Sequence, residues 1–165
     1  MRNMLTVYTV GAIAGLTYDE CFAAFNERVE KLRLMGYTVL HPIYDIEILK
    51  GEAILKSEGM SSPELCNHAI TMTDFWYVDN ADILFVDFTN ATERPSIGSV
   101  AEISRAYAKG KLIVTVMQKQ NIHRHAFILE MSSVVYESME DAYAYFERKI
   151  ESIYGANPGT KSRVH

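Results

Sequence analysis

Cysteine is scarce in this sequence, with two residues, Cys21 and Cys66, in a chain of 165. Their spacing fits neither a zinc site nor a redox pair, and no secretory pattern precedes them, so we expect reduced thiols in a cytoplasmic protein. Histidine lacks metal spacing as well, because His123 and His125 lie two residues apart and no cysteine accompanies them. We therefore expect no metal and take both histidines as surface or loop residues.

Positive charge and long apolar runs are lacking too. The formal net charge is -5 and lysine and arginine form no cluster, which argues against binding of a nucleic acid polymer. No apolar run approaches the roughly 20 residues that cross a bilayer, so we expect no membrane association. The apolar fraction of 48% instead suits a packed core. We expect a single domain at residues 1–154 and a loose polar tail at 155–165.

What the chain does contain is a regular alternation of strand and helix patterns. Strands are expected at residues 5–10, 37–40, 83–86, 112–116 and 134–136. Helices are expected from Thr17 to Gly36, Leu65 to Val78, Ser96 to Lys109, Arg124 to Ser132 and Met139 to Tyr154. This alternation predicts an α/β domain with a flavodoxin-like, doubly wound, five-stranded parallel sheet and helices on both faces.

The first of these helices has the clearest start. Thr17 is a good N-cap, and Glu20 three residues later completes a capping box. Apolar residues at helical spacing, namely Phe22, Phe25, Val29 and Leu32, predict its buried face. The segment 43–65, by contrast, has a weak pattern and is expected to be a long, partly helical excursion of the kind that often serves as a lid.

Ligands of doubly wound folds lie at the carboxyl ends of the strands, so the loops there are searched for chemistry. The first such loop has Gly11 and Gly15, which permit a tight turn and close approach of a ligand. A simple turn before a helix explains the two glycines equally well. The spacing is not the dinucleotide-binding fingerprint.

The loop after the third strand carries a stronger signal. Ser96 begins a helix whose free N–H groups at residues 97–99 favour an anion, and the Ser96 and Ser99 hydroxyls add donors. Glu102 lies roughly 9 Å farther along the helix axis, about the span from a 5′-phosphate to C1′ of the same ribose. An ordinary capped helix with a solvated Glu102 would show the same pattern.

Two further residues are candidates for the same edge of the sheet. Asp74 stands among Met72, Phe75 and Trp76, and apolar neighbours tend to raise the pKa of an acid. A surface position is the alternative for Asp74. Tyr8, near the end of the first strand, either brings its phenol to the site or is a core residue.

Four segments together resemble the nucleoside 2-deoxyribosyltransferase family, which includes the related (deoxy)nucleoside 5′-monophosphate N-hydrolases. They are residues 7–15, Asp74 ahead of 80–84, residues 96–102 and residues 106–111. The resemblance implies that Glu102 is a nucleophile forming a covalent glycosyl–enzyme, that Asp74 assists departure of the base, and that Tyr8 orients Glu102. It also implies a homo-oligomer, at least a dimer, with shared sites. No cofactor is needed, because the carboxylates supply both nucleophile and acid.

The resemblance leaves two branches open. The transferases usually carry an aspartate six residues before the nucleophile to hold the 5′-OH, whereas the hydrolases carry a serine there. Ser96 therefore favours a 5′-monophosphate, which a carboxylate would repel. His125 matches a position from which the hydrolases reach the neighbouring subunit's phosphate site. Ala14, however, stands where those hydrolases have an arginine, which argues against phosphate.

The leading hypothesis is an enzyme that cleaves the N-glycosidic bond of a (deoxy)nucleoside 5′-monophosphate. Its binding residues would be Gly11, Ile13, Gly15, His41, Ser96, Gly98, Ser99 and His125. We expect the base pocket at Ile13, His41 and the 43–65 excursion. The alternatives are base exchange between free deoxynucleosides and a non-catalytic nucleotide-sensing module.

Overall fold

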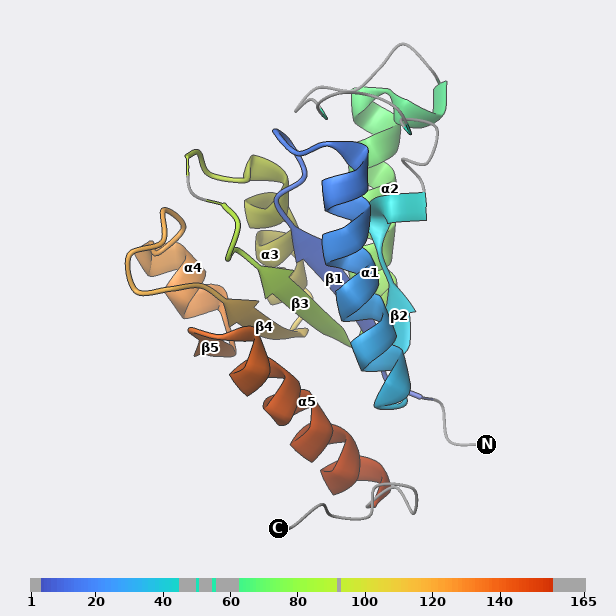
Figure 1. Ribbon diagram of the computed structural model, residues 1–165, viewed down its shortest axis with the longest axis vertical. Helices are drawn as coiled ribbons and strands as arrows, with labels where there is room; N and C mark the ends of the chain where they lie inside the picture. The colour runs from blue at the N-terminus through green and yellow to red at the C-terminus, as the bar shows by residue number, and fades with distance from the viewer. Residues whose placement is uncertain (1–3, 45–49, 51–54, 56–62, 92, 156–165) are drawn as a thin grey trace.

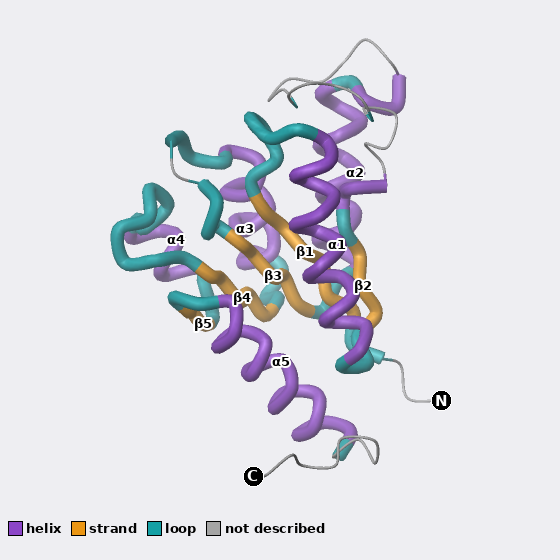
Figure 2. Tube along the Cα trace, viewed as in Figure 1, coloured by secondary structure: helices purple, strands orange, loops and turns teal. Residues whose placement is uncertain are grey.

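Five parallel strands form one sheet at the centre of the computed structural model, which describes residues 4–44, 50, 55, 63–91 and 93–155 (Figures 1 and 2). The strands are β1 (Thr6–Gly11), β2 (Thr38–Leu40), β3 (Ile83–Asp87), β4 (Leu112–Val116) and β5 (Val134–Tyr136). Their order is β2-β1-β3-β4-β5, and each neighbouring pair is parallel. The predicted doubly wound, flavodoxin-like sheet is therefore confirmed.

Helices cover both faces of this sheet. They are α1 (Tyr18–Leu34), α2 (Asn67–Asn80), α3 (Ile97–Ala108), α4 (Ala126–Met131) and α5 (Met139–Tyr154). In Figure 1, α1 and α5 lie in front of the sheet and α2, α3 and α4 behind it. Two apolar clusters fill the two layers, one packed under α1 and α5 and the other under α2, α3 and α4.

Alternation along β1 decides which of its side chains can meet which helices. Val7 belongs to the cluster under α1 and α5, whereas Tyr8 and Val10 belong to the cluster under α2, α3 and α4. Tyr8 is fully buried although it carries a polar hydroxyl. That hydroxyl therefore needs a partner on α2 or α3.

The starts of α1 and α3 test the capping and burial predicted from local sequence patterns. The Thr17–Glu20 capping box is present, with the Thr17 N–H donating to Glu20 and the Glu20 N–H donating to the Thr17 hydroxyl. The prediction that Phe22 shares the buried face was wrong, because it is 38% exposed and stacks on Tyr18. Ser96 is the N-cap residue of α3, but the expected capping bond from its side chain is absent.

Most of the 43–65 segment lies outside the described residues, so the predicted lid stays a prediction. Its ends form two short 3-10 helices, η1 (Pro42–Tyr44) and η3 (Pro63–Leu65). Within it, Leu55 is buried and exchanges backbone hydrogen bonds with Gly15 and Leu16. The tail beyond residue 155 also lies outside the described residues. No helix in the described ranges is long and apolar enough to cross a membrane.

Candidate active site

Three of the predicted site residues meet beside the middle of β1, on the face of the sheet that α2 and α3 cover. The Tyr8 hydroxyl donates to Glu102 Oε1 on α3 at 2.8 Å, and Asp74 Oδ1 on α2 lies 3.4 Å from the same hydroxyl. Glu102 is buried and Asp74 is half-buried. A phenol has a single proton to donate, so the shorter bond to Glu102 is the principal one. Two carboxylates thus face one hydroxyl from two different helices.

Burial makes these groups hold their protons. Removal from water and, second to it, the negative charge of Asp74 raise the pKa of Glu102 to about 8, while the hydrogen bond from Tyr8 opposes the rise. The pKa of Tyr8 lies well above its usual value, first because of burial and then because of the two carboxylates. Tyr8 therefore stays a neutral donor while Glu102 can exchange a proton near neutral pH.

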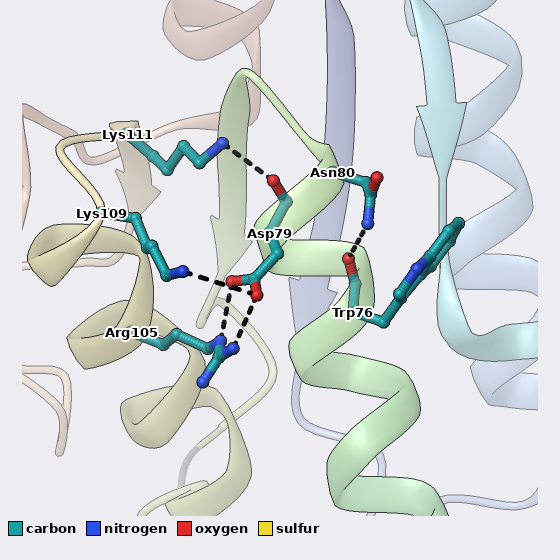
Figure 3. Close-up of polar contacts among 6 residues, drawn as sticks. All are labelled: Trp76, Asp79, Asn80, Arg105, Lys109 and Lys111. Carbon is teal, nitrogen blue, oxygen red and sulfur yellow. Dashed lines mark hydrogen bonds and ion pairs between the residues drawn. The ribbon is translucent and has the colours of Figure 1, made fainter.

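An ion-pair cluster on the outer side of α2 and α3 holds these two helices together (Figure 3). Arg105 of α3 binds both carboxylate oxygens of Asp79 on α2, at 2.8 and 2.6 Å, and Lys109 lies 3.7 Å from the same carboxylate. Lys111 donates to the Asp79 carbonyl at 3.0 Å. Because Asp79 follows Asp74 on α2 and Arg105 follows Glu102 on α3, this cluster fixes the two carboxylates relative to each other.

The amino end of α3 is built from hydroxyls and a buried histidine. The Ser96 and Ser99 hydroxyls hydrogen-bond each other at 2.9 Å, and Ser99 is buried. The Ser96 N–H donates to Nε2 of His123 at 2.7 Å. His123 lies in a loop, one of the two predicted alternatives, and its ring is buried at 3% exposure. Glu102 lies on the helix that begins at this amino end, as predicted from its position six residues after Ser96.

The glycine loop after β1 lies near charged side chains at both of its glycines, Gly11 and Gly15. A side chain on Gly11 would press against the backbone carbonyl of Asp87 and the guanidinium of Arg28. The Asp87 carboxylate and Arg28 form a buried ion pair on the α1 side. Gly15 has a φ of 95°, a conformation that favours glycine. The guanidinium of Arg94 comes within 3.8 Å of where a Gly15 Cβ would stand. Arg94 thus spans from the loop before α3 to the glycine loop.

The remaining predicted residues occupy varied positions. His41 is buried directly after β2, and Ile13 packs on the cluster that contains Ile43 and Leu55. Gly98 is exposed in the first turn of α3. His125 is exposed and accepts the Phe127 N–H through Nδ1 at 3.3 Å, as the N-cap of α4. Its predicted contact with a neighbouring subunit stays a prediction.

The surroundings predicted for Asp74 were partly wrong. Met72 and Trp76 point outward, at 52% and 57% exposure, so they do not enclose the carboxylate. Its environment comes instead from Tyr8 and Glu102, which lie far away in the sequence. Local neighbours could not have revealed this.

Sequence reasoning also missed Arg94 and His123 as parts of the site. Arg94 lies two residues before Ser96, and a cation beside an anion-favouring helix start was a usable signal. For His123 no local pattern indicated the contact with Ser96. Among the described residues, no group of three or more His, Cys, Asp or Glu side chains is placed to hold a metal ion.

Comparisons with known proteins relate the chain to others by fold. No protein-family model matches it, and no curated protein matches it significantly. Three solved structures share its fold over 87–89% of its length. A 2-deoxyribosyltransferase from Bacillus psychrosaccharolyticus has a TM-score of 0.63 at 17% identity, with 95% of that chain covered. A conserved protein from Enterococcus faecalis has 0.59 at 18%, with 99% covered, and a CMP N-glycosidase from Clostridium botulinum has 0.52 at 15%, with 98% covered.

Proposed function

We propose that this chain is an enzyme of the nucleoside 2-deoxyribosyltransferase type that cleaves the N-glycosidic bond of a (deoxy)nucleoside 5′-monophosphate. The observation that carries the proposal is the buried Glu102 carboxyl, held by the Tyr8 hydroxyl and facing Asp74 beside β1. That a 2-deoxyribosyltransferase and a CMP N-glycosidase share the fold supports chemistry at a glycosidic bond.

The proposed reaction proceeds in two displacements. In the first, the proton that the two carboxyls share resides on Asp74, so that a Glu102 carboxylate oxygen attacks C1′ of the sugar, the C1′–N bond breaks, and the base leaves with that proton. In the second, water attacks C1′ of the glycosyl ester, its proton passes to Asp74, and Glu102 leaves as a carboxylate. The net change is nucleotide plus water to sugar 5-phosphate plus free base. The Tyr8 hydroxyl orients the nucleophile through its 2.8 Å bond.

The amino end of α3 supports a phosphate as the 5′ group. The Ser96 and Ser99 hydroxyls and the N–H groups of the first turn offer uncharged donors, and the helix dipole favours an anion there. Arg94 adds a positive charge between this turn and Gly15. The glycine loop carries Ala14 in place of an arginine, and Arg94 brings a guanidinium to that loop from the opposite side.

The test is base release from the common nucleoside and deoxynucleoside 5′-monophosphates, followed by chromatography. Wild-type protein should release free base, and Glu102→Ala should remain folded but release none. Glu147→Gln, an exposed acid on α5, serves as the control and should behave as wild type. Release undiminished in Glu102→Ala would refute the proposal.

Two rivals are distinguished by the same assay. Base exchange between free deoxynucleosides would give a new nucleoside when a second base is added, with no requirement for 5′-phosphate. A nucleotide-sensing module would bind nucleotides without turnover and would be insensitive to substitution of Glu102. The absence of a carboxylate at Ser96 is the observation against exchange, since the exchange enzymes usually place an aspartate there.

A homo-oligomer is the proposed assembly, and the face formed by α2, α3 and α4 is its proposed contact surface. Large apolar side chains are exposed on this face, namely Met72, Trp76, Ile97, Tyr107, Phe127 and Leu129. Met72 and Trp76 also line a surface hollow of about 440 Å³ with Arg105. A second copy packed against this face would take these apolar side chains out of water, which favours association. His125 lies beside it at the start of α4, where it could reach a neighbouring site.

A further inference from the structure

His123 is a buried side chain with contacts on all sides. Its ring lies flat on that of Phe88, with centroids 3.7 Å apart and planes inclined by 4°. Phe88 itself is fixed to β4, because its N–H donates to the Val116 carbonyl at 2.9 Å. Asn121 completes the enclosure by donating through Nδ2 to the Phe88 carbonyl at 2.7 Å.

These contacts define the protonation of the imidazole. A backbone N–H can only donate, so Nε2, which lies 2.7 Å from the Ser96 nitrogen, must carry a lone pair. The ring proton is then on Nδ1 and is donated to Asn121 Oδ1 at 3.1 Å. The same oxygen accepts the His123 N–H at 2.9 Å, which fixes the orientation of the amide. Burial lowers the pKa of His123, in keeping with a neutral ring.

This arrangement connects the β4–α4 loop to the first residue of the proposed phosphate site. The Ser96 N–H is occupied by His123 and cannot serve an anion, which leaves the N–H groups of Ile97, Gly98 and Ser99 for one. Holding the Ser96 backbone also fixes the starting point of its hydroxyl, which pairs with Ser99 at 2.9 Å. The side chain of Ser96 does not cap the helix itself. His123 supplies the alignment that a local cap would otherwise give.

We propose that His123 is a positioning residue for the 5′-phosphate, an inference that rests on the proposed function. As a neutral, Nδ1-protonated imidazole clamped between Phe88 and Asn121, it fixes the backbone at Ser96 so that the first turn of α3 presents its donors to the substrate. It acts through Ser96 and touches neither the sugar nor the base. Its effect falls on affinity for the phosphate and not on the chemical step at C1′.

Two substitutions separate the contacts of His123. His123→Phe keeps a ring that can stack on Phe88 but removes the acceptor for Ser96, whereas His123→Gln keeps an acceptor near the Nε2 position and removes the stacking ring. We expect His123→Phe to weaken binding of deoxynucleoside 5′-monophosphates about three- to tenfold, the usual effect of losing one neutral hydrogen bond. Binding of free deoxynucleosides and kcat should stay within about twofold. His123→Gln should restore most of the phosphate affinity.

Measuring Kd by calorimetry in the Glu102→Gln background makes this test independent of turnover. If the wild type releases no base but His123→Phe selectively weakens monophosphate binding, the proposed reaction fails and the positioning role stands. If monophosphates and nucleosides are weakened alike, or neither is affected, or phosphate adds nothing to affinity in any variant, the positioning role is overturned. The ¹⁵N spectrum of His123 in the unaltered protein is a second readout. It should show a neutral ring protonated on Nδ1 at pH 7, and any other form would contradict the inference.

Discussion

At the residue scale, the proposed chemistry depends on the burial of Glu102. The carboxyl lies where the free energy of folding would favour an apolar side chain, and one hydrogen bond from Tyr8 only partly offsets its removal from water. A carboxylate with few solvating partners is a better nucleophile than one in water. The same feature that makes Glu102 useful therefore makes it costly to the folded state.

This cost has a pH dependence whose sign can be worked out. Glu102 has a usual pKa of 4.5 when unfolded and one of about 8 when folded. Between these values the folded protein holds a proton that the unfolded chain has released, so the free energy of unfolding falls as the pH rises from about 4.5 to about 8. Below pH 4.5 both states are protonated and the effect vanishes.

Glu102→Gln should therefore stabilise the protein in a pH-dependent way. The amide oxygen can still accept from Tyr8, and nothing at the position ionises. We expect the variant to gain on the order of 3 kcal/mol over wild type at pH 7 and little at pH 4.5. Urea denaturation at the two pH values measures this, with Glu147→Gln as control. An equal gain at both pH values would show that Glu102 is not a buried, protonated acid.

Residue patterns in the sequence predicted the identity of these side chains but not their contacts. Tyr8 and Glu102 are separated by 94 positions, and no periodicity reports a pairing over that distance. The resemblance in segments 7–15 and 96–102 is what linked them. Arg94 and His123 belong to no such segment, and only the folded chain places them at Gly15 and Ser96.

At the scale of elements, the alternation of patterns was sufficient to predict the fold. The last two strands and the last helix have the bounds predicted for them, and the others begin or end within a few residues of their predictions. Parallel strands buried on both faces read as continuous apolar runs, which are easy to detect. The 43–65 segment lacked such a pattern, and the contact of Leu55 with the glycine loop could not be foreseen.

The proposed role of the amino end of α3 in selecting the 5′ group can be tested by one substitution. Ser96→Asp places a carboxylate where the phosphate is proposed to bind, so repulsion should raise KM for 5′-monophosphates by about tenfold or more. Free deoxynucleosides should be affected far less, because a carboxylate can accept from a 5′-OH. Steady-state kinetics on matched pairs, such as deoxycytidine and its monophosphate, report the ratio.

Ser104→Asp provides the control for that substitution. Ser104 is exposed on the same helix, two residues after Glu102. Its replacement by aspartate therefore introduces the same charge away from the first turn. It should leave the ratio of the two KM values unchanged. A similar loss for both substrates in Ser96→Asp would mean that the first turn of α3 does not distinguish phosphate from hydroxyl.

At the scale of the whole molecule, we propose that a second copy completes the site. If His125 of one subunit serves the phosphate site of its partner, subunits with different defects should complement each other. Mixing Glu102→Ala with His125→Ala subunits, after a cycle of mild dissociation, should produce hybrid dimers with one intact site. Activity should then rise clearly above the sum of the two separate proteins. No rise in a sample shown by sedimentation to contain dimers would place His125 outside the site.

The proposed covalent glycosyl intermediate on Glu102 can be observed by mass spectrometry. Wild-type protein would be mixed with excess deoxynucleoside 5′-monophosphate, quenched in acid within milliseconds to seconds and digested with a protease. We expect the peptide containing Glu102 to gain the mass of a deoxyribosyl 5-phosphate group as free base appears, and Glu102→Gln to show neither the added mass nor the free base. Added mass on a residue other than Glu102, or undiminished base release by Glu102→Gln, would contradict an intermediate on Glu102.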